Sequence, residues 1–293
     1  MVLCGAYRCS FALIAVLIGA GCDSVFGLQH VRPIDAPPIS IDAPPPLPFN
    51  TAVAIEELNT GGMEEDDPSL TGDLTELYFL RSSDIWMSLR GSATAPWGIP
   101  GLVSQLNTAT TELRPSVAAD GLTLYFSRGV LGNRDVYVST RAARGQPWGV
   151  PTLLALDLNR PSTDEHVGWS SPDGLTLIVE SQTAAGANPD LYLATRPAIG
   201  APFTSEPIAA LNSQADETGG WATADGERVV FSSNRFGDYA IFEAIWFDGG
   251  WSVFHHPELD TAGPESTPWL SPDGNTIVFA RSLPRDDLFT ANR

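Results

Sequence analysis

The sequence contains no lysine, so every positive charge it carries must come from arginine. There are 16 arginines against 35 acidic residues, which gives a formal net charge of −19. Nucleic acid binding needs clusters of cations that displace counterions from phosphates, so this balance argues against a DNA or RNA partner. The same charge disfavours direct adsorption to an anionic lipid surface. We therefore expect no nucleic acid partner and no membrane contact through a basic surface.

Histidine is scarce as well, and the familiar catalytic motifs are missing. The four histidines are His30, His166, His255 and His256. No two of them have metal-ligand spacing, which argues against a zinc site. No Gly-x-Ser-x-Gly nucleophile elbow, phosphate-binding loop or dinucleotide fingerprint occurs. The sequence thus predicts no cofactor and leaves metal binding undetermined.

Cysteine is confined to the first 22 residues, which leaves no disulfide framework for the rest of the chain. Residues 11–18 are wholly apolar and follow Arg8, a length that suits a signal peptide and is too short to span a membrane. Small residues at 19–21 lead directly into Cys22. This N-terminus resembles a bacterial lipoprotein signal, which implies removal of residues 1–21 and acylation of Cys22. The expected location is the cell envelope, on the periplasmic or cell-surface side, with plain secretion as the alternative.

Proline dominates the segment that follows. Seven of the 17 residues at 32–48 are proline. Proline fixes φ and removes the amide donor, so this stretch should be extended and lie outside any packed sheet. At about 3 Å per residue it would hold a domain roughly 50 Å from an acyl anchor. The prediction is a lipid-anchored tether over residues 22–48.

The rest of the chain repeats itself five times. One aspartate opens a turn in each repeat, at intervals of 47, 53, 52 and 48 residues: Asp73, Asp120, Asp173, Asp225 and Asp273. Glycine follows this aspartate in four repeats. Asp-Gly between apolar runs is a strong hairpin signal, because the turn needs positive φ. Leu74 replaces the glycine in the first repeat, which predicts a turn of another type there.

Each repeat holds four strand-like pieces without helical periodicity, as expected for a blade of an all-β propeller. Residues 49–59 match the fourth piece but precede the first repeat, and the last repeat stops at Arg293 after its third piece. The N-terminal strand should therefore complete the last blade, which removes two exposed sheet edges. The prediction is a five-bladed β-propeller of four-stranded blades over residues 49–293, closed by the N-terminal strand.

The recurring motif also points to a family. The motif begins with Ser-Pro-Asp-Gly, continues with an apolar strand and an Arg or Ser, and ends with Asp before an aliphatic and an aromatic residue. This motif resembles the WD40-like (PD40) propeller repeats of the TolB C-terminal type. The resemblance covers about residues 49–293. It implies the propeller fold and favours an interaction scaffold, although propellers host many unrelated activities.

Glutamate occupies the position eight residues before every turn aspartate. The five are Glu65, Glu112, Glu165, Glu217 and Glu265. Five-fold symmetry would place them in a ring near one mouth of the central channel, where they could bind a cation or a basic ligand. Alternatively, they brace the blades through backbone amides or through Arg81, Arg128 and Arg281. We favour the brace, because repeats preserve structural devices whereas a site needs asymmetry.

Other recurring residues suggest structure rather than chemistry. Four blades carry an aspartate at the start of the third strand and an arginine six residues later; the arginines are Arg90, Arg141, Arg196 and Arg293. One inner-strand position holds tryptophan in three blades, which indicates packing, with a sugar-stacking platform as the alternative: Trp169, Trp221 and Trp269. The acids that break the symmetry are Asp66, Asp67, Asp164 and Asp216.

Together these features favour a monomeric, non-catalytic envelope lipoprotein whose propeller binds an envelope protein or a peptide. The alternative is a carbohydrate-active enzyme of glycoside hydrolase type, with paired carboxylates at the channel mouth. The asymmetric acids would supply such a pair. A structural propeller stabilised by a cation is a third reading. Catalysis stays open, and no catalytic residue is predicted.

Overall fold

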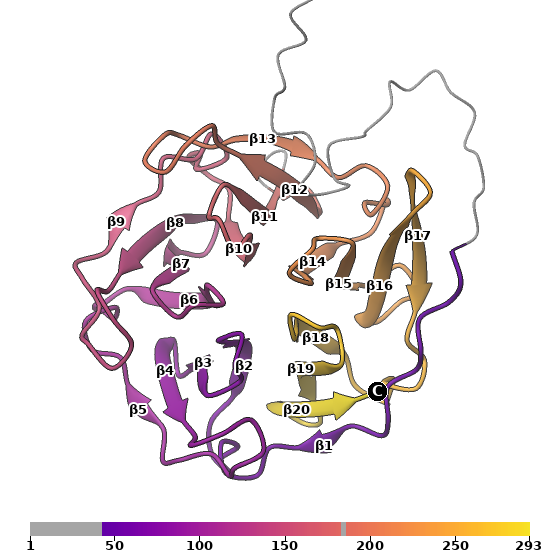
Figure 1. Ribbon diagram of the computed structural model, residues 1–293, viewed down its shortest axis with the longest axis horizontal. Helices are drawn as coiled ribbons and strands as arrows, with labels where there is room; N and C mark the ends of the chain where they lie inside the picture. Colours follow the sequence, from indigo (N-terminus) through magenta and orange to yellow (C-terminus); the bar gives the residue numbers. More distant parts are fainter. Residues whose placement is uncertain (1–42, 183–185) are drawn as a thin grey trace, which may run out of the picture.

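The described residues form five antiparallel sheets arranged in a ring (Figure 1). The computed structural model describes residues 43–182 and 186–293. Cys22, the predicted signal peptide and most of the predicted tether therefore lie outside the described residues. Within the described ranges there is no helix long and apolar enough to cross a membrane.

Every sheet is one blade of four strands, and the first strand of each blade lies nearest the axis. Blade one contains β2(Glu65–Leu70), β3(Glu76–Arg81), β4(Asp84–Leu89) and β5(Gly101–Leu102). Blade two contains β6(Thr111–Val117), β7(Thr123–Val130), β8(Asn133–Thr140) and β9(Thr152–Leu153). Blade three contains β10(Glu165–Ser170), β11(Thr176–Gln182), β12(Pro189–Thr195) and β13(Thr204–Pro207). Blade four contains β14(Glu217–Ala222), β15(Arg228–Ser233), β16(Ala240–Phe247) and β17(Gly250–His255). Blade five contains β18(Glu265–Leu270), β19(Thr276–Ser282) and β20(Asp286–Asn292), with β1(Val53–Ala54) outside them.

The ring closes through the N-terminal strand, as the sequence predicts. Strand β1 pairs antiparallel with β20, with Val53 opposite Thr290. Beyond the strand, the Asn59 side chain accepts from the Leu288 amide at 2.7 Å and donates to its carbonyl at 3.0 Å. The first and last strands of the described propeller thus complete one blade, and the predicted all-β five-bladed propeller is confirmed.

The turns between the first and second strands share one geometry in all five blades. The four glycines after the turn aspartates have φ between 68° and 73°. Leu74 has φ 63° and donates to Thr71, as Gly121 does to Ala118. The prediction of a different turn in blade one is therefore wrong. Hydrogen bonds from Thr71 and Thr75 to the Asp73 carboxylate hold the same turn although a leucine must adopt left-handed φ.

Each first strand also carries an irregularity in its pairing with the second strand. The register shifts two to three residues after the repeated glutamate, for example between Asp66 and Ser69 in blade one. At the shift, Asp67, Arg114 and Thr267 adopt φ of 50–54°. Such bulges turn a side chain away from the regular pleat. In this ring they put the irregular residues at the channel wall.

The last six residues of the predicted tether lie against the ring. The Ala43 amide donates to Ser252 in β17, and the Leu47 carbonyl accepts from Arg293 at 3.0 Å. Residues 43–52 belong to no strand, as expected for a proline-rich stretch. The end of this segment therefore contacts blade four and the C-terminal arginine.

Candidate functional site

The five repeated glutamates are buried at the start of the first strands, each at most 2% exposed. In blade two, Glu112 accepts from the Thr108 amide at 2.9 Å and from Arg128 Nε at 2.8 Å. Arg128 Nη2 donates in addition to the Leu106 carbonyl, in the segment that leaves blade one. Glutamate and arginine together thus connect one blade to the preceding one.

This contact recurs in three further blades. The arginines that bind a repeated glutamate and a leucine carbonyl of the preceding segment are Arg81, Arg128, Arg235 and Arg281. Blade three differs, because Ser181 takes the place of the arginine and donates to Glu165 at 3.1 Å. Burial raises the pKa of Glu165. The two pockets at the centre of the ring are lined by other residues than the five glutamates.

A second recurring arginine holds the turn of its own blade. Arg90, Arg141, Arg196 and Arg293 each donate Nε to the carbonyl that follows the turn aspartate, at 2.6–2.9 Å. Each guanidinium also lies over an aromatic ring of the same repeat position, 4.1–4.5 Å from the centroid. Blade four has Trp246 at this position instead, packed on Trp251. The predicted structural role is thus filled by a turn clamp that the sequence pattern did not specify.

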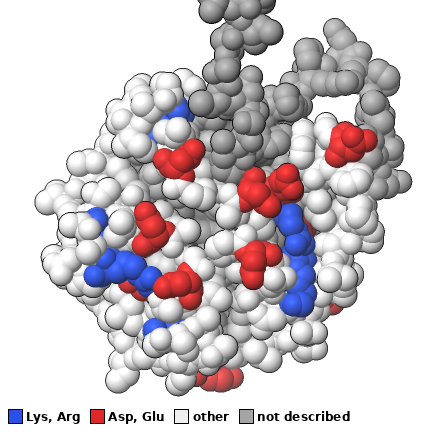
Figure 2. All heavy atoms as spheres, in the orientation of Figure 1, with Lys and Arg blue, Asp and Glu red and all other residues white. Residues whose placement is uncertain are grey.

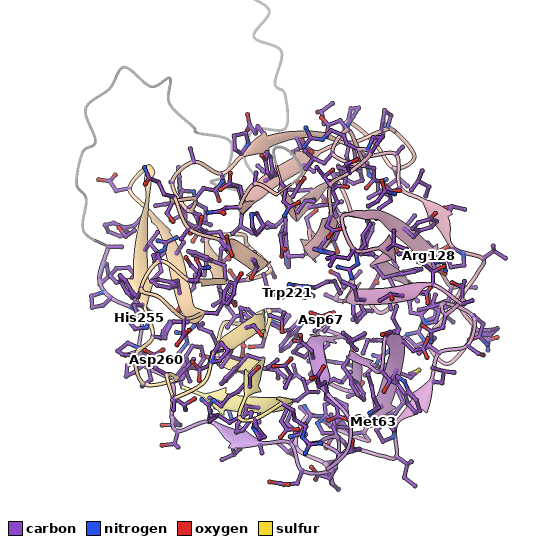
Figure 3. All side chains as sticks on the ribbon, turned by 180° about the vertical axis from the view of Figure 1, so that it is seen from behind. Met63, Asp67, Arg128, Trp221, His255 and Asp260 are labelled. Atoms are coloured by element: carbon purple, nitrogen blue, oxygen red, sulfur yellow. The ribbon has the colours of Figure 1, made fainter. Side chains whose placement is uncertain are left out.

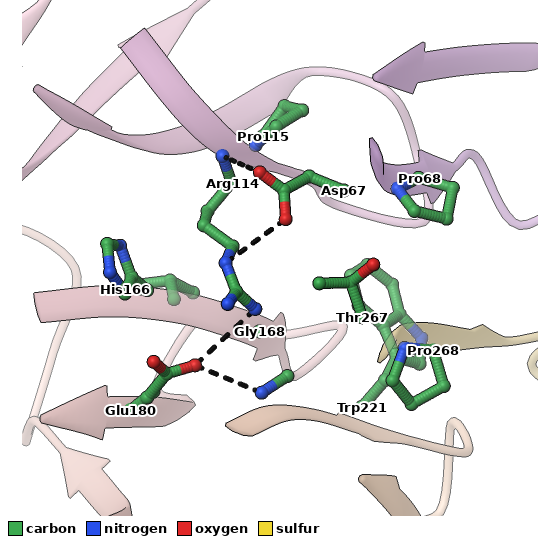
Figure 4. Close-up of a pocket in the computed structure, with 12 residues that line it drawn as sticks. Asp67, Pro68, Arg114, Pro115, His166, Gly168, Glu180, Trp221, Thr267 and Pro268 are labelled. Carbon is green, nitrogen blue, oxygen red and sulfur yellow. Dashed lines mark hydrogen bonds and ion pairs between the residues drawn. The ribbon is translucent and has the colours of Figure 1, made fainter. Parts of the chain in front are cut away.

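The channel contains a polar pocket at the level of the bulges (Figure 4). Arg114 lies at its centre: Nε is 3.1 Å from Asp67 Oδ1, and Nη1 is 3.4 Å from Glu180 Oε2. The Arg114 amide donates to Asp67 Oδ2 at 3.0 Å, and the Gly219 amide donates to Glu180 at 3.1 Å. One cation therefore bridges two carboxylates from different blades.

Burial decides the charge state of this pocket. It raises the pKa of Asp67 to about 7, with help from the neighbouring Asp66 and against the pull of Arg114. Burial likewise raises the pKa of Glu180. The pKa of His166, whose Nδ1 lies 2.6 Å from Ser127 Oγ, is lowered well below its usual value by burial and then by Arg114. The channel pocket can thus exchange a proton near neutral pH.

Of the four asymmetric acids, only Asp67 lines this pocket. Asp66 accepts from the Thr267 hydroxyl at 2.7 Å. Asp164 accepts from the Gly132 and Arg134 amides, both at 3.0 Å. Asp216 accepts from the Tyr239 hydroxyl at 2.7 Å and from an asparagine amide. Asp66 acts electrostatically on Asp67, and Asp164 and Asp216 act on Glu180, although none of these three lines the pocket.

A second, small and mainly apolar pocket of about 20 Å³ lies at the turn end of the channel. Trp169, Trp221 and Trp269 line it together with leucine, valine and proline side chains. Its outer residues include those directly before the five turn aspartates, so these acids stand at its rim. Figure 2 views the ring along its axis and shows acidic side chains around its centre, and Figure 3 places Trp221 and Asp67 beside that axis.

The three tryptophans belong to the hydrophobic core, as the packing interpretation predicts, and they also line this pocket. Trp221 and Trp269 lie 5.9 Å apart between ring centroids. The indole Nε1 of Trp269 is buried and meets no hydrogen-bond acceptor among the described residues. A buried donor without an acceptor is costly in a folded protein. Trp269 thus lines the pocket while its indole N–H lies buried without an acceptor among the described residues.

Sequence reasoning missed Arg114 and Glu180. Arg114 stands two residues after the repeated glutamate of its blade, where the other blades have Asp67, Val167, Gly219 and Thr267. Five different residues at one aligned position of the repeat are the signal that could have identified Arg114 as a candidate site residue. Glu180 carries no such mark, because its position is defined only by the fold.

Comparison with solved structures supports the fold. The chain is similar to a putative TolB from Agrobacterium tumefaciens, with 19% identity and a TM-score of 0.50 over 78% of this chain and 76% of that one. It is also similar to TolB from Acinetobacter baumannii, with 18% identity and a TM-score of 0.50, over 79% of this chain and 55% of that one. No protein-family model and no curated protein sequence matches the chain. The chain is thus a five-bladed β-propeller that is similar in fold to these TolB structures.

Proposed function

We propose that this chain is a non-catalytic envelope lipoprotein whose propeller binds a peptide or protein segment at the turn end of the channel. The observation that carries the proposal is the tryptophan pocket, which is lined by Trp269, a residue whose buried indole N–H has no acceptor among the described residues. A peptide supplies what this pocket lacks. Its backbone carbonyl can accept from the indole, and an apolar side chain can pack against the tryptophans at the mouth of the pocket.

The five turn aspartates at the rim of the pocket indicate which charge the bound peptide should carry. Among the five turn aspartates, Asp73 is paired with Arg144 at 2.5 Å. Asp173 and Asp225 accept only uncharged donors in the contacts described here. A segment with a positive charge next to its apolar residue would therefore be favoured over an acidic one. The repeated glutamates serve in this proposal as a brace between blades.

The experiment removes the indole N–H donor of Trp269 and keeps an aromatic side chain at this position. In Trp269→Phe the indole N–H is lost while the aromatic packing largely remains. Protein with and without this change is cross-linked in its native envelope and the captured segments are identified by mass spectrometry. Synthetic copies of those segments are then titrated against tryptophan fluorescence.

The matched control is Trp86→Phe, since Trp86 also has a buried Nε1 without an acceptor but lies outside the pocket. We expect Trp269→Phe to weaken peptide binding about tenfold, by one hydrogen bond, and Trp86→Phe to leave it unchanged. Equal affinity in all three proteins would refute binding at this pocket.

A second candidate rests on one specific observation, the raised pKa of Asp67. A carboxyl that is still protonated near pH 7 can act as a general acid in glycoside hydrolysis, with a second carboxylate such as Glu180 as its partner. Arg114 between them opposes this role, because it neutralises both groups. Hydrolysis of a polysaccharide that disappears in Asp67→Asn would establish the enzyme instead of the scaffold.

A further inference from the structure

Blade four departs from the repeat at a position where the other blades carry a structural asparagine. Each asparagine accepts from the amide and donates to the carbonyl of one residue in the third strand, at 2.7–3.3 Å. The four are Asn59, Asn107, Asn159 and Asn212. In blade four the residue is Asp260. An ionised carboxylate cannot donate, so this clamp cannot form in blade four.

Asp260 is directed to another partner. Its Oδ2 lies 2.9 Å from His255 Nε2, and both side chains are partly exposed, His255 by 24% and Asp260 by 36%. The two residues line a pocket of about 180 Å³ between blades four and five. Its other residues come from the connection between β15 and β16 and from the segment that leads into β18. These connections lie on the face opposite the turn aspartates, and Figure 3 shows His255 and Asp260 towards the rim of the ring.

Aromatic rings form one wall of this pocket. Phe236 is 71% exposed, although a phenylalanine would gain by burial. Its ring centroid is 5.4 Å from that of Phe242 and 5.3 Å from that of His255. The pocket therefore has an aromatic face that is held in place from behind and open in front.

The charge of the lining is negative. Asp238, Asp260 and Glu265 line the pocket, and no arginine does. Glu265 is neutralised by Arg281 at 3.0 Å. Arg235 is the nearest arginine in the chain to Phe236, but its guanidinium lies over Phe242 and donates to Glu217. Among the lining residues, Asp238 and Asp260 thus have only the imidazole of His255 as a possible positive partner.

We infer that this pocket binds an organic cation, an ammonium or guanidinium group that packs on Phe236 and is neutralised by Asp260 and Asp238. An exposed aromatic face next to carboxylates is the chemistry that recognises such groups. The cation can belong to a soluble or lipid-borne amine, or to a lysine or arginine side chain of a partner protein. The site shares no lining residue with the tryptophan pocket, so it is independent of the proposed peptide binding.

The test uses the full chain and small probes. Choline and Nα-acetyl-lysine methylamide are titrated by calorimetry, alongside 3,3-dimethylbutan-1-ol, which has the shape of choline without its charge. We expect at least one of the two cations to bind at least tenfold more tightly than the neutral alcohol. Tighter binding of choline would point to a free or lipid-borne amine, and tighter binding of the lysine derivative to a partner side chain.

Asp260→Asn is the sharpest variant, because it removes the carboxylate and restores the asparagine of the other four blades. It should keep or raise the melting temperature and still lose at least tenfold in cation affinity. Phe236→Ala should lose affinity in the same range. Asp248→Asn removes an exposed acid of the same blade outside the pocket and should bind as the unaltered protein does.

Three results would overturn the inference. The first is no binding of either cation, and the second is equal affinity for the neutral alcohol. The third is undiminished binding in Asp260→Asn. Cellobiose is titrated in parallel, and binding of this sugar without binding of the cations would mark the pocket as a saccharide site. Trp269→Phe should leave cation affinity unchanged, which separates this outcome from that of the proposed peptide binding.

Discussion

A repeated glutamate in this ring lies where water hardly reaches it. Glu112 is fully buried, and Arg128 Nε approaches it to 2.8 Å while Nη2 reaches the Leu106 carbonyl of the preceding blade. Removal of one partner of such a pair leaves the other charge uncompensated, which costs more than the intact pair contributes. The brace should therefore matter for stability rather than for ligands.

Glu112→Gln tests the brace at the scale of one residue. We expect the free energy of unfolding in urea to fall by about 2 kcal/mol, because Arg128 keeps a hydrogen-bond acceptor but loses its counter-charge. The matched control is Glu165→Gln in blade three, where Ser181 replaces the arginine and burial already raises the pKa of the carboxyl. Its loss should be clearly smaller. Equal losses in both variants would show that the arginine is not the reason for the stability.

Asp67 should make the stability depend on pH, because burial raises its pKa to about 7 from an ordinary value near 4. Between these two values the folded chain binds the proton more tightly than the unfolded chain does. The stability from protonated Asp67 is thus fully present below about pH 4 and is lost as pH rises to about 7. In Asp67→Asn the free energy of unfolding should fall less steeply over this range. Identical slopes for the two proteins would contradict the assignment of the proton to Asp67.

The same residues show what could be predicted from the sequence and what could not. Glu112 was found because five copies at one spacing reveal the position without any knowledge of the fold. The polar pocket was not predicted, because Arg114 and Glu180 occur once each and meet only when separate blades close around the axis. Asp67 was singled out only as an acid that breaks the symmetry, since its pKa depends on burial.

At the scale of the strand, side-chain clamps to the backbone hold each blade in register. Asn107 accepts from the Ile85 amide and donates to the carbonyls of Ile85 and Val103 at 2.9 and 3.2 Å. It thus ties the third strand of blade one to the segment that leaves the blade. Blade four does without this clamp, which shows that one missing clamp is compatible with the ring.

Asn107→Asp copies the exchange of blade four into blade one. The ionised carboxylate cannot donate, so the carbonyls of Ile85 and Val103 each lose one of two donors and keep a backbone amide. With two hydrogen bonds lost, the free energy of unfolding should fall by about 2 kcal/mol. Asn107→Ser, which keeps a donor but shortens the side chain, provides a comparison. Chemical unfolding of both variants at pH 7 measures the effect. A loss below about 0.5 kcal/mol would mean that the clamp is not needed to hold the strands.

The turns between the first and second strands can be predicted from the local sequence only in part. The four Asp-Gly pairs predict their turns correctly because glycine adopts positive φ without steric cost. The exception at Leu74 was misread, since the local sequence does not reveal that Asp73 is fixed by Thr71, Thr75 and Arg144. Arg144 comes from the next blade, so part of this turn is determined outside its own repeat.

At the scale of the whole molecule, the ends of the folded domain meet in blade five. Strand β1 completes the sheet, and Arg293 lies over the Phe49 ring and binds Glu243 of blade four. His256 and two arginines, Arg293 and Arg228, surround the same carboxylate and lower the pKa of Glu243 to about 2, with His256 and Arg293 as the main causes. A chain that enters the ring beside this closure can carry the domain on a tether without disturbing the other blades.

The tether matters only if the chain is anchored, and this depends on Cys22. Acylation of this residue would hold the propeller at a membrane through lipid alone, since the net charge of −19 disfavours direct adsorption to anionic lipid. Cys22→Ser should therefore move the protein from the membrane fraction to the soluble fraction, and the intact mass should lose the acyl chains. Cys9→Ser is the control, because Cys9 lies in the segment that would be removed and its exchange should change neither fraction nor mass. Membrane association that persists in Cys22→Ser would show that something other than this cysteine holds the propeller at the membrane.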